Sequence, residues 1–293
     1  MDKVRLLISR MSTRIQPHLN QVPVLLRLKE AVKRLYFLRW RGKHTEIYIV
    51  SYPKSGRTWL RLLLGKVVCD IFGVSDKEAL DTYNLTKELA VPCVQFTHDG
   101  TDNEYARAFS DLRISRSVFE NKKVVLLTRD PRDLLVSNYY QSTKRENVFD
   151  EDLSSFVRSD KHGIRKIQRF YSIWHEEAQD RENFLHLRYE ELHRNPQKVL
   201  KELLHFIGLE QVKEDFVQSA VSFASFGNMK NMEREHYFNK VSMRPADVED
   251  ENSYKVRKGE IGGYDEELSE DDLVCIERVL KEYGSPFYPD LIT

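Results

Sequence analysis

The sequence of 293 residues is poor in cysteine, and its three cysteines follow no metal-binding or disulfide pattern. Cys69, Cys93 and Cys275 each lie within or beside an apolar run, and no two of them form a CxxC pair. This pattern favours reduced, buried thiols over a disulfide framework or a zinc site. The sequence also lacks clustered metal ligands of the HExxH kind, so we expect no metal cofactor.

Long apolar runs and an excess of charge are missing as well. No run approaches the 18 or more residues that a membrane-spanning helix needs, and the N-terminus lacks the apolar segment and cleavage site of a signal peptide. The 46 lysines and arginines balance 46 aspartates and glutamates, which gives no reason to expect nucleic-acid binding. We therefore expect a cytoplasmic protein that binds no nucleic acid.

The first 43 residues differ from the rest in charge. They contain 11 lysines and arginines but only Asp2 and Glu30, and apolar residues recur at helical spacing between Val24 and Leu38. Such a basic, helical segment can pack on a domain with a solvated face or bind an anionic membrane surface, and disorder is a third interpretation. We expect a basic N-terminal helical extension over residues 1–43, with peripheral membrane contact left open, and one large domain over residues 44–293.

From residue 46 onward, predicted strands and helices alternate. Strands are expected at 47–50, 94–96, 123–128 and 184–188, and helices at 58–72, 131–141, 165–179, 196–207 and, after the N-cap Ser269, near the C-terminus. This alternation implies right-handed crossovers and a mostly parallel central sheet, that is, a three-layer α/β/α fold. Residues 228–265 are polar and poorly periodic, which predicts a long functional loop.

The first predicted strand ends in "YPKSGRTW", Tyr52 to Trp59, and leads into a helix. A strand that turns through a glycine into a helix directs backbone N–H groups and the helix dipole at one point, which favours an anion. Lys54, Ser55 and Thr58 add a cation and two hydroxyl donors. The Walker pattern GxxxxGK[ST] is absent because Lys54 precedes Gly56. The alternative is a strand-to-helix turn with incidental polar residues.

Two further segments predict anion sites. In "TRDPRDLLVSNYY", Arg129 lies at the carboxyl end of a strand, and Ser137 follows about two turns along the next helix. A salt bridge from Arg129 or Arg132 to Asp133 is the alternative. In "VRKGEIGGY", two cations precede Gly259, and a solvated charge pair is the alternative. Three such sites indicate a ligand with more than one phosphate-like group.

In this order, the motifs resemble those of the cytosolic type of sulfotransferase that uses 3′-phosphoadenosine 5′-phosphosulfate (PAPS). "YPKSGRTW" resembles the 5′-phosphosulfate loop of that family, and "TRDPRDLLVSNYY" and "RKGEIGGY" resemble its 3′-phosphate elements. "LRYEEL" and "ASFGNMKNM" resemble its adenine-binding segments. The resemblance implies a P-loop-like sulfotransferase fold, PAPS as co-substrate without a metal, and a small-molecule or lipid-like hydroxyl acceptor. It leaves monomer and homodimer open.

The resemblance also implies a role for individual residues. Lys54, Ser55, Gly56, Arg57 and Thr58 would hold the 5′-phosphosulfate, and Arg129, Ser137, Arg257, Lys258 and Gly259 would hold the 3′-phosphate. Trp59 would stack on the adenine with Tyr189 and Phe226 around it, although core packing is the alternative for Trp59. In "VQFTHDG", His98 would be the general base, and Lys54 would stabilise the bridging oxygen. A structural role is the alternative for His98.

The sequence departs from the family pattern at two points. The family usually carries a lysine two residues before its histidine, where this sequence has Phe96, and Arg57 is one candidate to replace its charge. "GGYDEEL" stands where animal members have Gly-Asp-Trp, which resembles bacterial members. A P-loop phosphotransferase and a non-catalytic anion-binding protein are the competing hypotheses. Methionine and aromatic residues between Asn228 and Pro245 permit a phenol, a sterol-like alcohol, a lipid or a natural product as acceptor.

Overall fold

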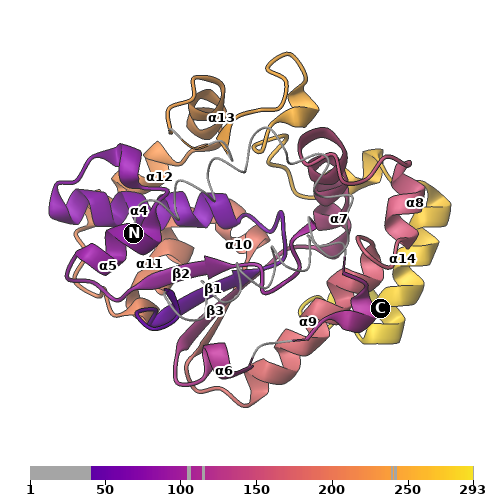
Figure 1. Ribbon diagram of the computed structural model, residues 1–293, viewed down its shortest axis with the longest axis horizontal. Coiled ribbons are helices and arrows are strands. Elements are labelled where there is room, and N and C mark those ends of the chain that lie inside the picture. Colours follow the sequence, from indigo (N-terminus) through magenta and orange to yellow (C-terminus); the bar gives the residue numbers. More distant parts are fainter. Residues whose placement is uncertain (1–40, 104–106, 114–115, 239, 241–242, 293) are drawn as a thin grey trace, which may run out of the picture. The chain divides into compact units, whose positions relative to one another are not determined.

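The computed structural model describes residues 41–103, 107–113, 116–238, 240 and 243–292 (Figure 1). The chain divides into two compact units, residues 1–44 and 45–293. The predicted basic extension lies almost entirely outside the described residues. Among the helices that are described, none is long and apolar enough to cross a membrane.

A four-stranded parallel sheet forms the centre of the second unit. The strands are β1 Ile47–Ser51, β2 Val94–Thr97, β3 Lys123–Thr128 and β4 Phe184–Arg188, in the order β2-β1-β3-β4. Val50 lies opposite Thr97, Ser51 opposite Leu127, and Thr128 opposite Arg188. The carboxyl ends of all four strands therefore meet along one edge, which is where open α/β sheets bind ligands.

Helices cover both faces of the sheet, with α4 on one side and α9 on the other (Figure 1). Ile47 and Ile49 of β1 pack into an apolar cluster with residues of α4, α11 and α12. Tyr48 points to the opposite face, where its ring meets Phe119 edge-on at 5.0 Å. This confirms the predicted three-layer α/β/α fold with a parallel sheet.

The helices follow the strands in sequence. They are α4 Arg57–Phe72, α5 Thr82–Glu88, α6 Arg116–Phe119, α7 Pro131–Tyr140, α8 Leu153–Arg158, α9 Ile164–Gln179, α10 Tyr189–Arg194, α11 Pro196–Ile207, α12 Glu214–Phe223, α13 Phe226–Arg234 and α14 Glu270–Tyr283. The C-terminal helix begins at the predicted N-cap: the Ser269 hydroxyl and the Asp272 carboxylate form a capping box. The three cysteines are free thiols, and Cys69 and Cys93 are buried as expected, whereas Cys275 on α14 is only half-buried.

The long loop predicted from the sequence was wrong in its first residues. Residues 228–265 were expected to form a long loop, but α13 continues to Arg234. Its buried positions are Met229, Met232 and Glu233, which lie on one helix face because they are spaced three and four residues apart. The only long apolar side chains on this face are two methionines set among charged residues, so the sequence showed little helical periodicity.

Candidate active site

The loop after β1 adopts the conformation of an anion cradle. Gly56 is the N-cap of α4 and has a φ of 91°, and Lys54 has a φ of 71°, a region that residues other than glycine rarely adopt. The Ser55 hydroxyl and the Trp59 indole nitrogen are buried and have no hydrogen-bond partner among the residues that the structure describes. Buried polar groups are normally paired, so both are available to donate to a ligand.

Three of the residues predicted around the nucleotide form one cluster beside Gly56. The Trp59 ring lies edge-on to Tyr189, with centroids 6.0 Å apart, and the guanidinium of Arg129 lies 4.3 Å from the centroid of the Tyr189 ring. A Cβ atom at Gly56 would come within 2.7 Å of that ring. Tyr189 therefore packs directly against the loop, and only glycine leaves room for it.

Arg129 links the end of β3 to the two other predicted anion-binding loops. Its guanidinium donates hydrogen bonds to the carbonyl oxygens of Lys54 (3.4 Å) and Glu260 (3.0 Å). Asp130 caps α7 by accepting a hydrogen bond from the Arg132 amide and also forms an ion pair with Arg132. Asp133 instead accepts backbone hydrogen bonds from the third loop. Among the described ion pairs and hydrogen bonds, the Asp133 carboxylate therefore has only backbone amides as partners. This argues against the alternative of a salt bridge from Arg129 or Arg132 to Asp133.

The third loop contributes its residues in different ways. Gly259 accepts a hydrogen bond from the His193 ring at 2.8 Å and lies against Phe226, whose ring a Cβ atom at Gly259 would approach to 2.3 Å. Arg257 pairs with Glu267 at 3.0 Å. Lys258 pairs with acidic neighbours and is about one-third exposed. Ser137 is half-buried on α7. Gly259 is thus next to the Arg129 cluster, whereas the Arg257 charge is already neutralised by a carboxylate.

His98 follows β2 and is anchored to the neighbouring strand. Its Nδ1 atom lies 2.7 Å from the Ser51 carbonyl oxygen. Because a carbonyl can only accept, Nδ1 carries the proton and Nε2 has a free lone pair. Burial, and then the positive charge of Arg57, hold the pKa of His98 well below its ordinary value. The imidazole is therefore neutral at pH 7 and can accept a proton at Nε2.

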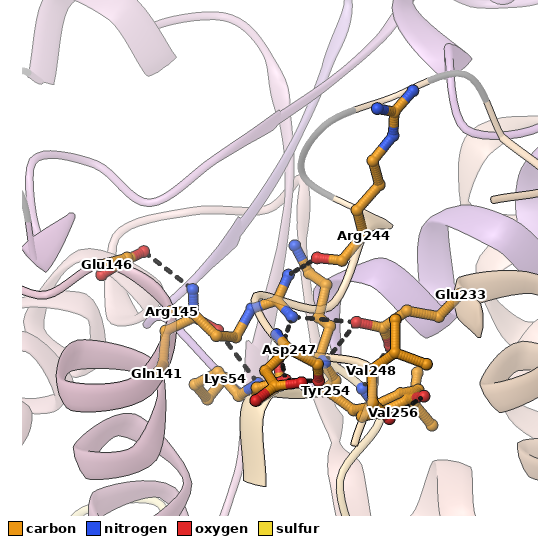
Figure 2. Close-up of polar contacts among 12 residues, drawn as sticks. Lys54, Gln141, Arg145, Glu146, Glu233, Arg244, Asp247, Val248, Tyr254 and Val256 are labelled. Carbon is orange, nitrogen blue, oxygen red and sulfur yellow. Dashed lines mark hydrogen bonds and ion pairs between the residues drawn. The ribbon is translucent and has the colours of Figure 1, made fainter. Parts of the chain in front are cut away.

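The Lys54 side chain contacts two later segments of the chain (Figure 2). Its ammonium donates hydrogen bonds to the Lys255 carbonyl oxygen (3.0 Å) and to Gln141 Oε1 (3.4 Å). Burial, followed by the charge of Arg145, lowers the pKa of Lys54 to about 7. An anion bound beside this ammonium would reverse that shift, because an opposite charge favours the protonated form.

A buried ion pair that the sequence did not reveal supports these contacts (Figure 2). Arg145 ends the π-helix Gln141–Arg145 that continues α7, and it pairs with Glu233 of α13 at 3.0 Å. The Glu233 carboxylate, which is fully buried, also accepts the backbone N–H groups of Lys255 (2.6 Å) and Val256 (3.0 Å). This carboxylate fixes the backbone that receives Lys54. The sequence separation of 88 positions between the two partners explains why no local motif marked the pair.

No group of three or more metal-ligating side chains lies close together within the described part of the chain. The site instead brings the cationic side chains of Lys54 and Arg129 and the neutral imidazole of His98 to the carboxyl ends of β1, β2 and β3. Such a site can bind an anion with several charged groups and can accept a proton at His98.

Comparison with known proteins agrees with this geometry. The family model described as the sulfotransferase domain matches residues 44–284. The 3-beta-hydroxysteroid sulfotransferase of Cavia porcellus is 27% identical over 267 residues, which cover 85% of this chain and 87% of that protein. The flavonol 4'-sulfotransferase of Flaveria chlorifolia is 23% identical over 83% of this chain and 80% of that protein. The chain belongs to the sulfotransferase domain family and is a sulfotransferase.

Solved structures with the same fold include a mouse sulfotransferase complexed with PAP, with a TM-score of 0.58 and 20% identity, covering 85% of this chain and 87% of that one. A retinol dehydratase in complex with retinol and PAP gives a TM-score of 0.60 at 18% identity, over 86% and 84% of the two chains. These similarities establish that the α/β architecture is that of the sulfotransferases.

Proposed function

We propose that this sulfotransferase moves the sulfo group of PAPS to the hydroxyl of a small-molecule or lipid-like acceptor, with His98 as general base. The observation that carries the proposal is the hydrogen bond from His98 to Ser51, at the end of β1. Through this bond a neutral imidazole is held against Ser51, which lies three residues before Lys54 of the loop predicted to bind the phosphosulfate. The PAP complexes of two proteins with the same fold support PAPS as donor.

The residues at the site fit the nucleotide. The glycine-capped start of α4 and the unpaired hydroxyl of Ser55 suit the 5′-phosphosulfate, together with Lys54, Arg57 and Thr58. Trp59, Tyr189 and Phe226 provide aromatic surfaces for the adenine. The 3′-phosphate is assigned to Arg129, Ser137, Arg257, Lys258 and Gly259. Arg257 now pairs with the Glu267 carboxylate. The phosphate would therefore displace this carboxylate or bind the Arg257 guanidinium together with it.

In the proposed reaction, the acceptor oxygen attacks sulfur while the bond from sulfur to the 5′-phosphate oxygen breaks. The acceptor proton moves to Nε2 of His98, whose tautomer the Ser51 carbonyl fixes. Negative charge grows on the departing phosphate oxygen, and the Lys54 ammonium stabilises it. Adenosine 3′,5′-bisphosphate (PAP) is the second product. The protein contributes position and charge, as in other in-line group transfers.

Arg61 is a better replacement than Arg57 for the lysine that Phe96 displaces. The Arg61 guanidinium lies 4.6 Å from the centroid of the Phe96 ring, so it returns a positive charge to the same place on β2. Arg57 is assigned to the donor loop. We also propose that residues 44–293 form the sulfotransferase domain, that residues 1–43 form a separate basic extension, and that the enzyme is cytoplasmic.

An assay with labelled PAPS and a panel of phenols, alcohols and sugars tests the proposal. Wild-type protein should transfer label to at least one acceptor, and the His98→Ala variant should bind PAP with unchanged affinity but transfer label at least 100-fold more slowly. Equal turnover by the variant would contradict the role of His98. Tighter binding of ATP with magnesium than of PAP would favour a phosphotransferase instead.

A further inference from the structure

The backbone of Arg129 is held by a side chain that has no part in the proposed reaction. Tyr171 lies on α9 and is fully buried. Its hydroxyl accepts a hydrogen bond from the Arg129 N–H group (3.0 Å) and donates one to the Arg129 carbonyl oxygen (2.6 Å). One phenol can form both bonds because it carries a proton and can also accept. Tyr171 thereby fixes the peptide groups on both sides of Arg129.

Glu190 holds the same turn from a second direction. Its buried carboxylate, on α10, accepts a hydrogen bond from the Asp130 N–H group at 2.7 Å. That N–H belongs to the peptide group whose carbonyl oxygen binds Tyr171, so this peptide group is held at both ends. β3 ends at Thr128, and backbone groups beyond it need partners from outside the sheet. Tyr171 and Glu190 supply them, which fixes the direction in which the Arg129 side chain leaves the backbone.

The segment that follows α14 completes this support, and it lies against α9 (Figure 1). The ring of Tyr288 stacks on that of Tyr171, with centroids 6.2 Å apart. The buried Tyr288 hydroxyl donates to the Glu190 carboxylate at 2.9 Å. Its single proton is used there, so Thr128 at 3.2 Å donates to Tyr288 and accepts a hydrogen bond from His186 Nε2 at 2.8 Å. Tyr288 therefore fixes the carboxylate that binds the Asp130 amide.

The side chain of Arg129 retains a donor for a ligand. Its guanidinium lies over the Tyr189 ring and donates to two backbone carbonyl oxygens. The Arg129 Nε atom is also buried, and it has no hydrogen-bond partner among the residues that the structure describes. Buried donors are normally paired, so this N–H group is available to an anion. A charge-assisted hydrogen bond depends on the alignment of donor and acceptor, and here the backbone of Arg129 sets that alignment.

We propose that Tyr171, Glu190 and Tyr288 are positioning residues that make the donor site selective for a 3′-phosphate. The inference rests on the proposed function, because it uses the assignment of Arg129 to the 3′-phosphate of PAPS. The three side chains act through the backbone of Arg129 and need not touch the nucleotide. Their loss weakens recognition of the 3′-phosphate and leaves binding of the adenine and the 5′-phosphate in place.

The direct test compares PAP with adenosine 5′-phosphate (AMP), which lacks only the 3′-phosphate. Calorimetric titration gives the preference for PAP, that is, the ratio of the dissociation constant for AMP to that for PAP. We expect wild-type protein to prefer PAP at least 100-fold. Tyr171→Phe and Tyr288→Phe, which remove a hydroxyl and keep the ring, should reduce this preference at least tenfold and threefold. The dissociation constant for AMP should stay within twofold.

Tyr283→Phe on α14 is the matched control and should keep the wild-type preference. Within the described part of the chain, the Tyr283 hydroxyl forms no hydrogen bond. Equal binding of PAP and AMP by wild type, an unchanged preference in both test variants, or an equal loss of both nucleotides would overturn the proposal. Partial unfolding of a variant weakens the apparent affinity for both nucleotides by the same factor, so the ratio of the two constants still measures the preference.

The role of Glu190 is tested by a conservative variant. Glu190→Gln keeps an oxygen that can accept from the Asp130 amide, and it should retain the preference for PAP within threefold. Glu190→Ala removes that acceptor and should reduce the preference at least tenfold. The same loss in both variants would contradict an action of Glu190 through the Asp130 amide.

A double-mutant cycle separates positioning from a general loss of structure. Arg129→Met alone should abolish most of the preference for PAP. Adding Tyr171→Phe to Arg129→Met should then change the preference less than twofold, because the backbone no longer carries a guanidinium. Equal factors in the two backgrounds would mean that Tyr171 acts independently of Arg129 and would refute the proposal.

Transfer of label from PAPS tests the proposed function separately. Wild-type protein that prefers PAP and loses the preference in Tyr171→Phe, yet transfers no label to any acceptor, would contradict the proposed reaction and support the inference. Transfer by wild type together with an unchanged preference in Tyr171→Phe and Tyr288→Phe would do the reverse.

Discussion

The imidazole of His98 and the carbonyl of Ser51 join the ends of two neighbouring strands, with 2.7 Å between Nδ1 and the oxygen. Ser51 is the last residue of β1, and His98 directly follows β2. The hydrogen bond therefore fixes both the position and the tautomer of the ring relative to the loop that begins at Tyr52. Any reaction that uses Nε2 of His98 takes place next to that loop.

Replacing His98 by asparagine separates this anchoring from proton transfer. The asparagine amide can donate to the Ser51 carbonyl from a place close to that of Nδ1, but it cannot accept a proton. We expect kcat to fall by about 10²- to 10⁴-fold and the dissociation constant for PAP to stay within twofold. His205→Asn, at an exposed position, is the control. Retention of wild-type kcat would rule out His98 as the base.

The low pKa of His98 predicts how activity depends on pH. A base must be neutral, and a pKa well below the ordinary value of 6.5 keeps His98 neutral throughout the neutral range. At saturating PAPS, whose charge keeps Lys54 protonated, the profile of kcat/KM for the acceptor should therefore stay flat as the pH falls to 6.5 and decline only below it. Removing the charge of Arg61 raises the pKa of His98, so Arg61→Met should move the decline to higher pH. An unchanged profile would show that Arg61 does not act on the base.

Binding of PAP should be accompanied by proton uptake at Lys54. The free enzyme has a Lys54 pKa of about 7, and the negative charge of the ligand raises it. Affinity is then fully present below pH 7 and falls as the pH rises from 7 toward the pKa of the complex. Calorimetry in buffers of different ionisation enthalpy measures this uptake at pH 8. Lys54→Met should abolish the part that arises from Lys54, and an identical uptake in the variant would disprove the assignment.

Two glycines at opposite ends of α4 form a matched pair. Gly56 and Gly73 both have positive φ, but an added Cβ at Gly56 would strike the Tyr189 ring, whereas at Gly73 it meets nothing within 4 Å. Alanine should cost about 1–2 kcal/mol of stability at either position through the backbone. Only Gly56→Ala should also weaken PAP binding, by at least tenfold, because it displaces Tyr189. Equal PAP affinities in the two variants would argue against Tyr189 as part of the nucleotide site.

The buried pair of Arg145 and Glu233 should be important for stability. Removing one partner of a buried pair leaves an uncompensated charge and typically costs about 3–5 kcal/mol, so Glu233→Ala should lower the free energy of unfolding by that amount. Chemical denaturation measures it. Glu191→Ala, which breaks the exposed pair with Arg194, should have little effect. A small effect at Glu233 would mean that Arg145 finds another partner.

Much of the fold followed from local sequence patterns. Apolar runs placed the strands within about a residue of their observed ends, and Ser269 with its acidic first turn located α14. The helix α13 was missed because its buried face combines methionines with the charged Glu233. Glu233 is buried only because Arg145 and two backbone amides meet it, and these partners are distant in sequence.

The candidate site could likewise be predicted only in part from local sequence patterns. Loops that follow strands have recognisable motifs, so Lys54, Gly56 and Arg129 could be identified, although their ligand roles remain predictions. Arg61 belongs to no motif, and its position near His98 arises from its contact across the α4–β2 packing with the ring of Phe96. The four-residue spacing between Arg57 and Arg61 was the one local signal that could have indicated a shared helix face.

The bonds of Glu233 also bear on how this enzyme could acquire new substrates. The Glu233 carboxylate on α13 accepts hydrogen bonds from the backbone amides of Lys255 and Val256. The chain segment between Glu233 and Lys255 therefore begins and ends at the same place. Residues can be inserted, deleted or substituted within this segment without moving its two ends. Natural variation in acceptor choice should therefore concentrate between residues 234 and 253, while the donor machinery at Lys54 is inherited unaltered.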